Sequence, residues 1–335
     1  MPPSPRRVTA IVTSQPDMLS LGPGAVERIL EAVRREVLGT LRRRGAVVAV
    51  SGGIDSSVVA ALCARALGPE RVLALLLPER DSSPEALRLG TQLADHLGVE
   101  RVVEDIEPAL TALGCYDRQL EAIRMVVPEY GEGWRCKLVL PSLLDGDRLN
   151  LVSLTVQDPE GRQATHRMSR PAYLQMVAAT NFKQRVRKTL EYYHADRLHY
   201  VVAGTPNRLE YDQGFFVKQG DGAADIKPIA HLYKSQVYAM AAELGLPDEI
   251  QGRSPTTDTF SLPQSQEEFY FALPYQQMDQ CLWAFDHDWT PEQTAGAIGL
   301  TADQVARVYR DIQAKRRVAQ YLHHAPRPLP DDPGS

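Results

Sequence analysis

The stretch AVVAVSGGIDSSVVAALC, residues 46–63, combines a short apolar strand, a glycine turn and the start of a helix. Residues 46–50 are small and apolar, as expected for a buried strand. A serine and two glycines follow at 51–53, and apolar side chains then recur with helical spacing from Ile54 onward. Such a turn directs backbone N–H groups and the positive end of a helix dipole at one point, which favours binding of a phosphate group.

The residue types in this turn suit a nucleotide. Glycine at positions 52 and 53 allows positive φ angles and close approach of a ligand. The carboxylate of Asp55 repels bare phosphate, so it suits this place only if it also holds a divalent cation. The phosphate-binding candidates are Ser51, Gly52, Gly53, Asp55, Ser56 and Ser57. The alternative is a plain Gly-Gly turn with a serine cap, because the stretch is neither a Walker A loop nor a G-x-G-x-x-G motif.

Composition describes an ordinary soluble globule. The chain has 335 residues, of which 44% are hydrophobic and 24% charged, and its net charge of −5 gives no general attraction to nucleic acid or to anionic membranes. The 4 cysteines form no C-x-x-C pair, which argues against a disulfide framework or zinc site and fits a reducing cytoplasm. No apolar run is long enough to span a membrane.

Predicted strands and helices alternate along most of the chain, which favours an α/β fold: a doubly wound parallel sheet with helices on both faces. In such sheets ligands bind at the carboxyl ends of strands, where the turn at 51–53 falls. Strands are expected at 46–50, 72–77, 99–106 and 199–203, and helices at 25–44, 54–67, 84–97, 172–195 and 233–244.

Two stretches break the alternation. Residues 115–171 form an irregular insert in which 149–156 and 163–168 resemble a β-hairpin, and residues 290–321 carry two capped helices. A DNA-binding helix–turn–helix is the alternative there, but it lacks a basic recognition helix. We expect an N-terminal tail at 1–24, a main domain at 25–285 containing the insert, a helical extension at 286–325 and a disordered tail at 326–335.

A second polar segment follows the expected strand at 199–203. Glu210 and Asp221 are carboxylates in this glycine-rich stretch, and Lys218 is a cation. Asp55 and Glu210 both follow strand ends of one sheet, so Glu210 could complete the cation site begun by Asp55. Mg²⁺ commonly takes one or two carboxylates and fills its other positions with phosphate oxygens and water. The alternative is a solvated surface loop. The basic segment at 181–188 could likewise be the solvated face of an ordinary helix.

The order of motifs resembles that of NAD⁺ synthetases, N-type ATP pyrophosphatases. The motifs are SGGIDSS at 51–57, NFKQRVR at 181–187, GTPNRLE at 204–210, GFFVKQGDGAADIKPI at 214–229, LYK at 232–234 and PTTD at 255–258. The resemblance implies an ATP-dependent amide ligase, in which the carboxylate of nicotinic acid adenine dinucleotide is adenylated, pyrophosphate leaves, and ammonia displaces AMP to give NAD⁺.

The resemblance also implies roles for individual residues. ATP would be bound by the 51–57 loop with Thr205 and Lys234, and Mg²⁺ by Asp55 and Glu210. The dinucleotide would contact Asn181, Arg185, Lys218, Asp221 and Asp258, and the catalytic residues would be Asp55, Lys218, Asp221 and Thr256. The family is usually homodimeric.

Departures from the family pattern lie on the acceptor side. Phe216-Val-Lys-Gln-Gly-Asp221 stands where many members have Phe-Thr-Lys-Tyr-Gly-Asp, and the insert at 115–171 is longer than in compact members. We therefore keep open an amide ligase that acts on a different carboxylate, a tRNA-modifying enzyme, and a nucleotide-binding protein without catalysis.

The nitrogen donor is expected to be free ammonia. No domain for glutamine hydrolysis is recognisable, and no cysteine has a nucleophile context. A separate protein could deliver the ammonia. The expected partners are thus small molecules, with neither nucleic acid nor membrane.

Overall fold

The computed structural model describes residues 19–140, 152–253 and 259–329. At its centre lies a parallel sheet with the strand order β3-β2-β1-β7. Ala46 of β1 lies opposite Val72 of β2 and Val201 of β7. The strands are β1 (Ala46–Ala49), β2 (Val72–Leu76), β3 (Glu100–Val103) and β7 (Val201–Val202).

Successive residues of the strands enter two different cores, as the pleat of a sheet requires. Val48 and Ala74 face one core, formed with α1, α2, α3 and α8, whereas Val47 and Leu75 face the other, formed with α4, α5 and α6. The first layer comprises α1 (Ala25–Arg34), a π-helical continuation η1 (Arg35–Thr40), α2 (Ile54–Leu67), η2 (Pro69–Arg71), α3 (Pro84–Leu97), α8 (Lys234–Glu243) and α9 (Asp248–Gln251). The second comprises α4 (Glu107–Ala112), α5 (Cys115–Arg124) and α6 (Arg170–Leu198). The prediction of a doubly wound sheet is confirmed.

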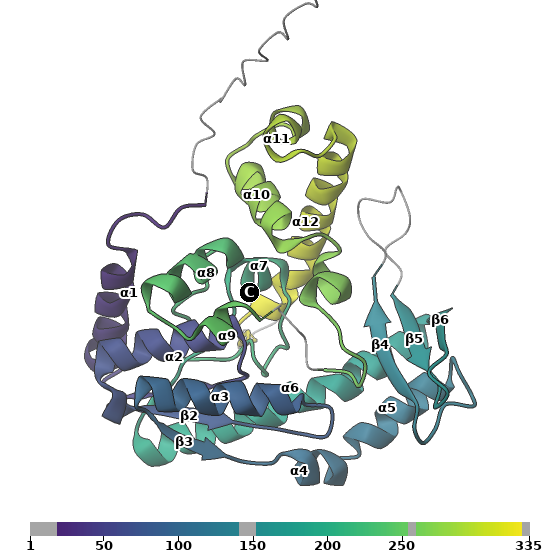
Figure 1. Ribbon diagram of the computed structural model, residues 1–335, viewed down its shortest axis with the longest axis horizontal. Coiled ribbons are helices and arrows are strands. Elements are labelled where there is room, and N and C mark those ends of the chain that lie inside the picture. Colours follow the sequence, from purple (N-terminus) through teal and green to yellow (C-terminus); the bar gives the residue numbers. More distant parts are fainter. Residues whose placement is uncertain (1–18, 141–151, 254–258, 330–335) are drawn as a thin grey trace, which may run out of the picture.

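A helical cluster is built on this core and contains the two capped helices that the sequence predicts (Figure 1). Thr290 and Thr301 each accept a hydrogen bond from the backbone three residues ahead, which starts the last two helices. The cluster has a core of its own, which includes Leu209, Met278 and Val308. Its elements are α7 (Arg208–Gln213), η3 (Glu267–Phe271), α10 (Tyr275–Asp286), α11 (Pro291–Ile298) and α12 (Ala302–His323).

The insert is more regular than the sequence suggests. The expected hairpin is present as β5 (Ser153–Gln157) and β6 (Gln163–Arg167), with residues 149–151 outside the described part. A third antiparallel strand, β4 (Arg135–Val139), pairs with β5, and α5 fills the start of the insert. Both were missed because their apolar residues pack on α6 and Phe260, which lie far away in the sequence. Figure 1 places this sheet at one side of the molecule.

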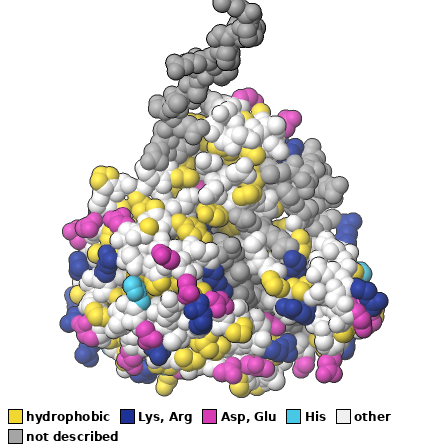
Figure 2. All heavy atoms as spheres, in the orientation of Figure 1, with side chains coloured by type: hydrophobic (Ala, Val, Ile, Leu, Met, Phe, Trp, Pro, Cys, Tyr) yellow, Lys and Arg dark blue, Asp and Glu magenta, His cyan; other side chains and the backbone are white. Residues whose placement is uncertain are grey.

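The surface carries both signs of charge. Lys and Arg side chains are interspersed with Asp and Glu over the face drawn in Figure 2, rather than gathered in one cationic patch on that face. Within the described residues, no helix has the length and apolarity that crossing a membrane would need.

Candidate functional site

The turn after β1 has the geometry that its sequence predicts. Gly52 has φ +70°, and a Cβ at this position would lie 2.6 Å from the carbonyl oxygen of Ala86. Both facts require glycine, because a side chain would be strained and would also collide with backbone. Gly53 is the N-cap of α2, and no described side chain caps this helix. The first N–H groups of α2 therefore face the space in front of the turn.

Serine hydroxyls brace the turn from within. The hydroxyl of Ser56 accepts from the backbone N–H of Ser51 at 3.2 Å and donates to the Gly53 carbonyl at 3.0 Å. The hydroxyl of Ser57, which is buried, donates to the same carbonyl at 2.8 Å. Ser57 therefore shapes the turn, while the exposed Ser51 remains at the mouth of the cavity.

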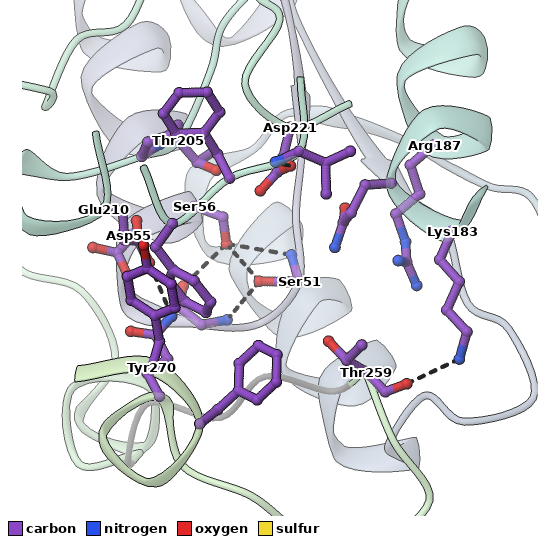
Figure 3. Close-up of a pocket in the computed structure, with 18 of the residues that line it drawn as sticks. Ser51, Asp55, Ser56, Lys183, Arg187, Thr205, Glu210, Asp221, Thr259 and Tyr270 are labelled. Carbon is purple, nitrogen blue, oxygen red and sulfur yellow. Dashed lines mark hydrogen bonds between the residues drawn. The ribbon is translucent and has the colours of Figure 1, made fainter. Parts of the chain in front are cut away.

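Asp55 meets the second predicted segment beside the turn (Figure 3). Its carboxylate forms an ion pair with Lys234 and accepts a hydrogen bond from the Nδ2 of Asn207 at 3.0 Å. Glu210 lies next to it and forms a capping box with Asn207, whose backbone N–H it accepts at 3.1 Å. Three sequence-predicted residues thus come together, although Asp55 is more than 150 positions away from both Glu210 and Lys234.

Burial and mutual charge shift the pKa values of the groups in this cluster. Desolvation, together with the negative charge of Asp55, raises the pKa of Glu210 to about 8. Burial by itself would lower the pKa of the Lys234 ammonium group. The nearby carboxylates of Asp55 and Glu210 have the larger effect, so this pKa is raised. Once Glu210 ionises, the two carboxylates and the one lysine carry a net negative charge, which a cation beside them would offset.

Asp279 fixes Lys234 from the helical cluster. Its carboxylate accepts the backbone N–H of Lys234 at 3.2 Å and that of Ser235 at 2.7 Å, so it caps the start of α8. Burial raises the pKa of Asp279 to about 6. No sequence pattern identifies Asp279, because its partner lies 45 positions away on another helix.

Asp55, Glu210 and Lys234 line a cavity of about 740 Å³ at the carboxyl edge of the sheet. The opposite wall is formed by α6, which supplies Asn181, Arg187 and the buried ion pair Lys188–Glu191 at 2.6 Å. Asp221 also lines the cavity, and burial raises its pKa. Thr205 lies at the end of β7 beside the turn. The volume is within the range of small-molecule sites.

Several predicted site residues lie elsewhere. Neither Arg185 nor Lys218 is among the described residues that line the cavity. They lie side by side, with Arg185 Nε donating to the Lys218 carbonyl at 3.3 Å, and Lys218 Nζ reaches the Tyr321 carbonyl at 2.9 Å. Thr256 and Asp258 fall outside the described residues.

Other lining residues had not been singled out from the sequence. Arg253 donates to the Ser51 carbonyl at 3.3 Å, and Gln266 donates to Glu210 at 2.9 Å. Lys183 is buried in α6 within the NFKQRVR motif, where its spacing could have suggested an inward face. An aromatic wall of Phe215 and Tyr270, stacked at 4.6 Å, closes the side towards α12.

The Asp55–Glu210 pair fits the needs of Mg²⁺. The described residues contain no group of three Asp, Glu, His or Cys side chains that could hold a metal by itself. Two adjacent carboxylates with an elevated pKa at Glu210, open to a cavity shaped for phosphate, match an ion that takes its remaining ligands from phosphate and water.

Comparison with known proteins agrees with this geometry. The NAD synthase family model matches residues 25–125 and 149–319. The chain is 63% identical to the NH(3)-dependent NAD(+) synthetase of Mesorhizobium japonicum over 310 residues, which are 92% of this chain and 97% of the relative.

Solved structures share the fold at low identity. The NMN synthetase of Francisella tularensis has a TM-score of 0.61 at 20% identity, covering 93% of this chain and 100% of that one. The NH3-dependent NAD synthetase of Campylobacter jejuni has a TM-score of 0.58 at 22% identity, covering 91% and 97%. From the family match and the sequence identity to its relatives, the chain belongs to the NAD synthase family.

Proposed function

We propose that this protein is an ammonia-dependent NAD⁺ synthetase. It adenylates the carboxylate of nicotinic acid adenine dinucleotide with ATP, releasing pyrophosphate, and ammonia then displaces AMP to form the amide of NAD⁺. The observation that carries the proposal is identity of 63% to a relative of that activity over nearly its whole length, with the ATP turn and its carboxylates in place. An amide ligase for a different carboxylate is the alternative.

The ATP side uses the turn and Lys234. Backbone N–H groups at Gly52, Gly53 and the start of α2 would hold phosphate oxygens. Ser51 would add a hydroxyl donor, as would Ser56 once its hydroxyl turns away from the Gly53 carbonyl. The ammonium of Lys234 would offset charge on the departing pyrophosphate. Thr205, at the end of β7, would contact the nucleotide beside it.

Asp55 and Glu210 would hold Mg²⁺, which when bound supplies charge neutralisation for the leaving pyrophosphate. Before nucleotide binding, Lys234 and Gln266 hold these two carboxylates in place. The ion pair keeps Asp55 oriented towards the turn, so the carboxylate is pre-organised for the incoming phosphates.

The acceptor side uses α6 and the 214–221 segment. Asn181 would hydrogen-bond the dinucleotide, and Asp221, a buried carboxylate with a raised pKa, would take the proton that ammonia loses as it attacks. Thr256 and Asp258 are proposed to act near the reacting centre. Arg185 and Lys218 would bind the far end of the dinucleotide, because they lie beside the cavity rather than in it.

The position of Arg185 and Lys218 beside the cavity supports a homodimer. Lys218 lies over the exposed ring of Tyr321 in α12, and Arg185 lies beside Lys218. A second subunit against these residues would bury the ring and bring more chain to the dinucleotide. Sedimentation equilibrium at micromolar concentration tests it, and a strictly monomeric yet fully active protein would contradict it.

Ammonia is proposed to arrive free or from a separate protein. The cytoplasm is the proposed compartment, since the four cysteines are buried free thiols, as is usual in reducing surroundings.

The decisive assay follows NAD⁺, AMP and pyrophosphate together in the purified protein. With ATP, Mg²⁺, ammonium and nicotinic acid adenine dinucleotide, the three products should form in equal amounts. Parallel reactions contain nicotinic acid mononucleotide, other carboxylic acids, or glutamine in place of ammonium. Turnover with another acid and none with the dinucleotide would overturn the proposal in favour of the alternative.

A further inference from the structure

Lys183 is an ammonium group buried in the wall of the cavity. It lies in α6, and its side chain is 1% exposed. Its Nζ donates to Glu79 at 3.0 Å, to Asp81 at 2.6 Å and to the carbonyl of Thr259 at 3.0 Å. An ammonium group has three N–H donors. All three donors are used by acceptors within the protein, so none is left for a ligand.

The three acceptors belong to two walls of the cavity that are distant in sequence. Glu79 and Asp81 lie in the turn after β2, whose neighbours Pro78 and Ser82 line the cavity. Thr259 lines it too, together with Phe260. Figure 3 draws the Lys183–Thr259 contact on the side of the cavity away from Asp55 and Glu210. Lys183 thus joins the sheet-edge turn to the 259–260 wall.

The turn depends on this lysine for its charge balance. The side chain of Glu79 is fully buried, and its second oxygen accepts the hydroxyl of Tyr116 at 2.9 Å. Asp81 is nearer the surface and also faces the guanidinium of Arg80 at 4.0 Å. Removing the lysine alone would therefore strand Glu79 as a buried charge, whereas Asp81 would keep a partner.

The 259–260 wall is held on its other side by the insert. Cys136 of β4 donates its N–H to the Ser261 hydroxyl at 2.9 Å, and its carbonyl accepts the N–H of Leu262 at 3.0 Å. This strand lies in the stretch that the family model does not match, between 125 and 149. The wall is therefore fixed from two directions, and Lys183 is its link to the sheet.

We propose that Lys183 is a positioning residue: by tying the turn at 79–81 to Thr259, it sets the shape of the cavity in which the acid is adenylated and amidated. The inference rests on the proposed function for the reaction concerned. It assigns Lys183 no contact with ATP, acid or ammonia. Displacement of a wall by about 1 Å can cost on the order of a hundredfold in rate.

The experiment separates positioning from charge balance. Lys183→Met keeps the length of the side chain but leaves Glu79 stranded, so both the melting temperature and kcat should fall. The double variant Lys183→Met/Glu79→Gln keeps the net charge of the cluster, and its glutamine still accepts from Tyr116. In the double variant the melting temperature should recover, while kcat should stay about tenfold or more below that of the parent.

A matched control is Arg316→Met. Arg316 also joins two carboxylates from different elements, Asp212 at 2.8 Å and Asp286 at 2.7 Å, but it does not line the cavity. This variant should lose stability and keep kcat within about twofold when assayed well below its melting temperature. Amide hydrogen exchange supplies a readout independent of turnover: exchange at residues 260–264 should quicken in both Lys183 variants and not in Arg316→Met.

The outcomes decide between the two roles. A double variant with parental kcat overturns the positioning role and leaves Lys183 as charge compensation. Unchanged exchange at 260–264 in both Lys183 variants overturns the tether itself. If the parent makes no NAD⁺ from the dinucleotide, the proposed function fails, and the kinetic comparison is made with whichever acid releases pyrophosphate.

Discussion

Glu210→Gln should make the ligand-free protein more stable while abolishing its activity. In the parent, Glu210 is buried beside Asp55, and its pKa rises to about 8 from an ordinary value of 4.5. Glutamine cannot ionise but keeps the shape of the side chain. Its carbonyl can accept the Asn207 N–H of the capping box, and its amide can donate to Gln266 once that amide turns over.

The magnitude follows from the shift in pKa. Because the folded pKa of Glu210 is raised, the folded state binds more protons than the unfolded state between pH 4.5 and 8, and stability falls as pH rises through this window. At about 1.4 kcal/mol per pKa unit, ionisation removes about 3 kcal/mol at pH 7 and about 5 kcal/mol above pH 9. Below pH 4.5 the two proteins should be equally stable, and at pH 8 Glu210→Gln should exceed the parent by several kcal/mol.

Two assays test this. Urea unfolding in EDTA, without nucleotide, at pH 5, 6, 7 and 8 gives the difference in the free energy of unfolding between variant and parent. Calorimetric titration with Mg²⁺ and ATP at pH 7, in buffers of different ionisation enthalpy, counts released protons, because metal binding requires the ionised carboxylate. The parent should release up to about one proton more than Glu210→Gln.

The reasoning is refuted by a pH-independent stability difference, or by equal proton release in parent and variant. Either result would mean that Glu210 is already ionised in the ligand-free protein. Full turnover in Glu210→Gln would separately remove Glu210 from the metal site.

Three further substitutions test the rest of the site. Asp55→Asn should lower kcat by about two orders of magnitude or more through loss of a Mg²⁺ ligand, and near-normal turnover would exclude it from the metal site. Gly52→Ala should raise the KM for ATP at least about tenfold and cost more stability than Gly98→Ala, because both glycines have positive φ but only Gly52 would bring its Cβ against backbone. Asp279→Ala should cost about 1–2 kcal/mol of stability as a lost cap and raise the KM for ATP through Lys234; an unchanged KM would contradict that link.

Where the signals are local, the sequence predicted the fold residue by residue. The helices α2 and α3 begin and end where their patterns place them, because Ser83 caps the start of α3 and Gly98, with φ +65°, ends it. Strand β1 and the turn after it are equally local. The strands β3 and β7 are shorter than expected: β3 pairs with β2 from Glu100 to Val103, and β7 pairs with β1 at Val201 and Val202.

Where the determinants are distant, sequence reasoning missed them. The contact of Lys183 with Glu79 spans 104 positions, and that of Cys136 with Ser261 spans 125. No sequence pattern around Lys183 or Ser261 indicates such a distant partner. Lys234 was identified only through its motif, although its ion pair with Asp55, 179 positions away, is what gives it a role.

In this site neutral groups hold the side chains in position, and the charged groups are those that would bind the ligand. Asn207 holds both carboxylates through an amide and a backbone N–H, neither of which changes with pH or with the arrival of phosphate. Lys234 pairs with Asp55, and its charge only partly offsets the effects of burial and of Asp55, which together keep the pKa of Glu210 high. An incoming cation and triphosphate would resolve this imbalance, with Mg²⁺ drawing the carboxylates and Lys234 turning to phosphate. Binding of Mg²⁺ and ATP would thus relieve the electrostatic cost of placing two carboxylates side by side, and Glu210→Gln measures that cost.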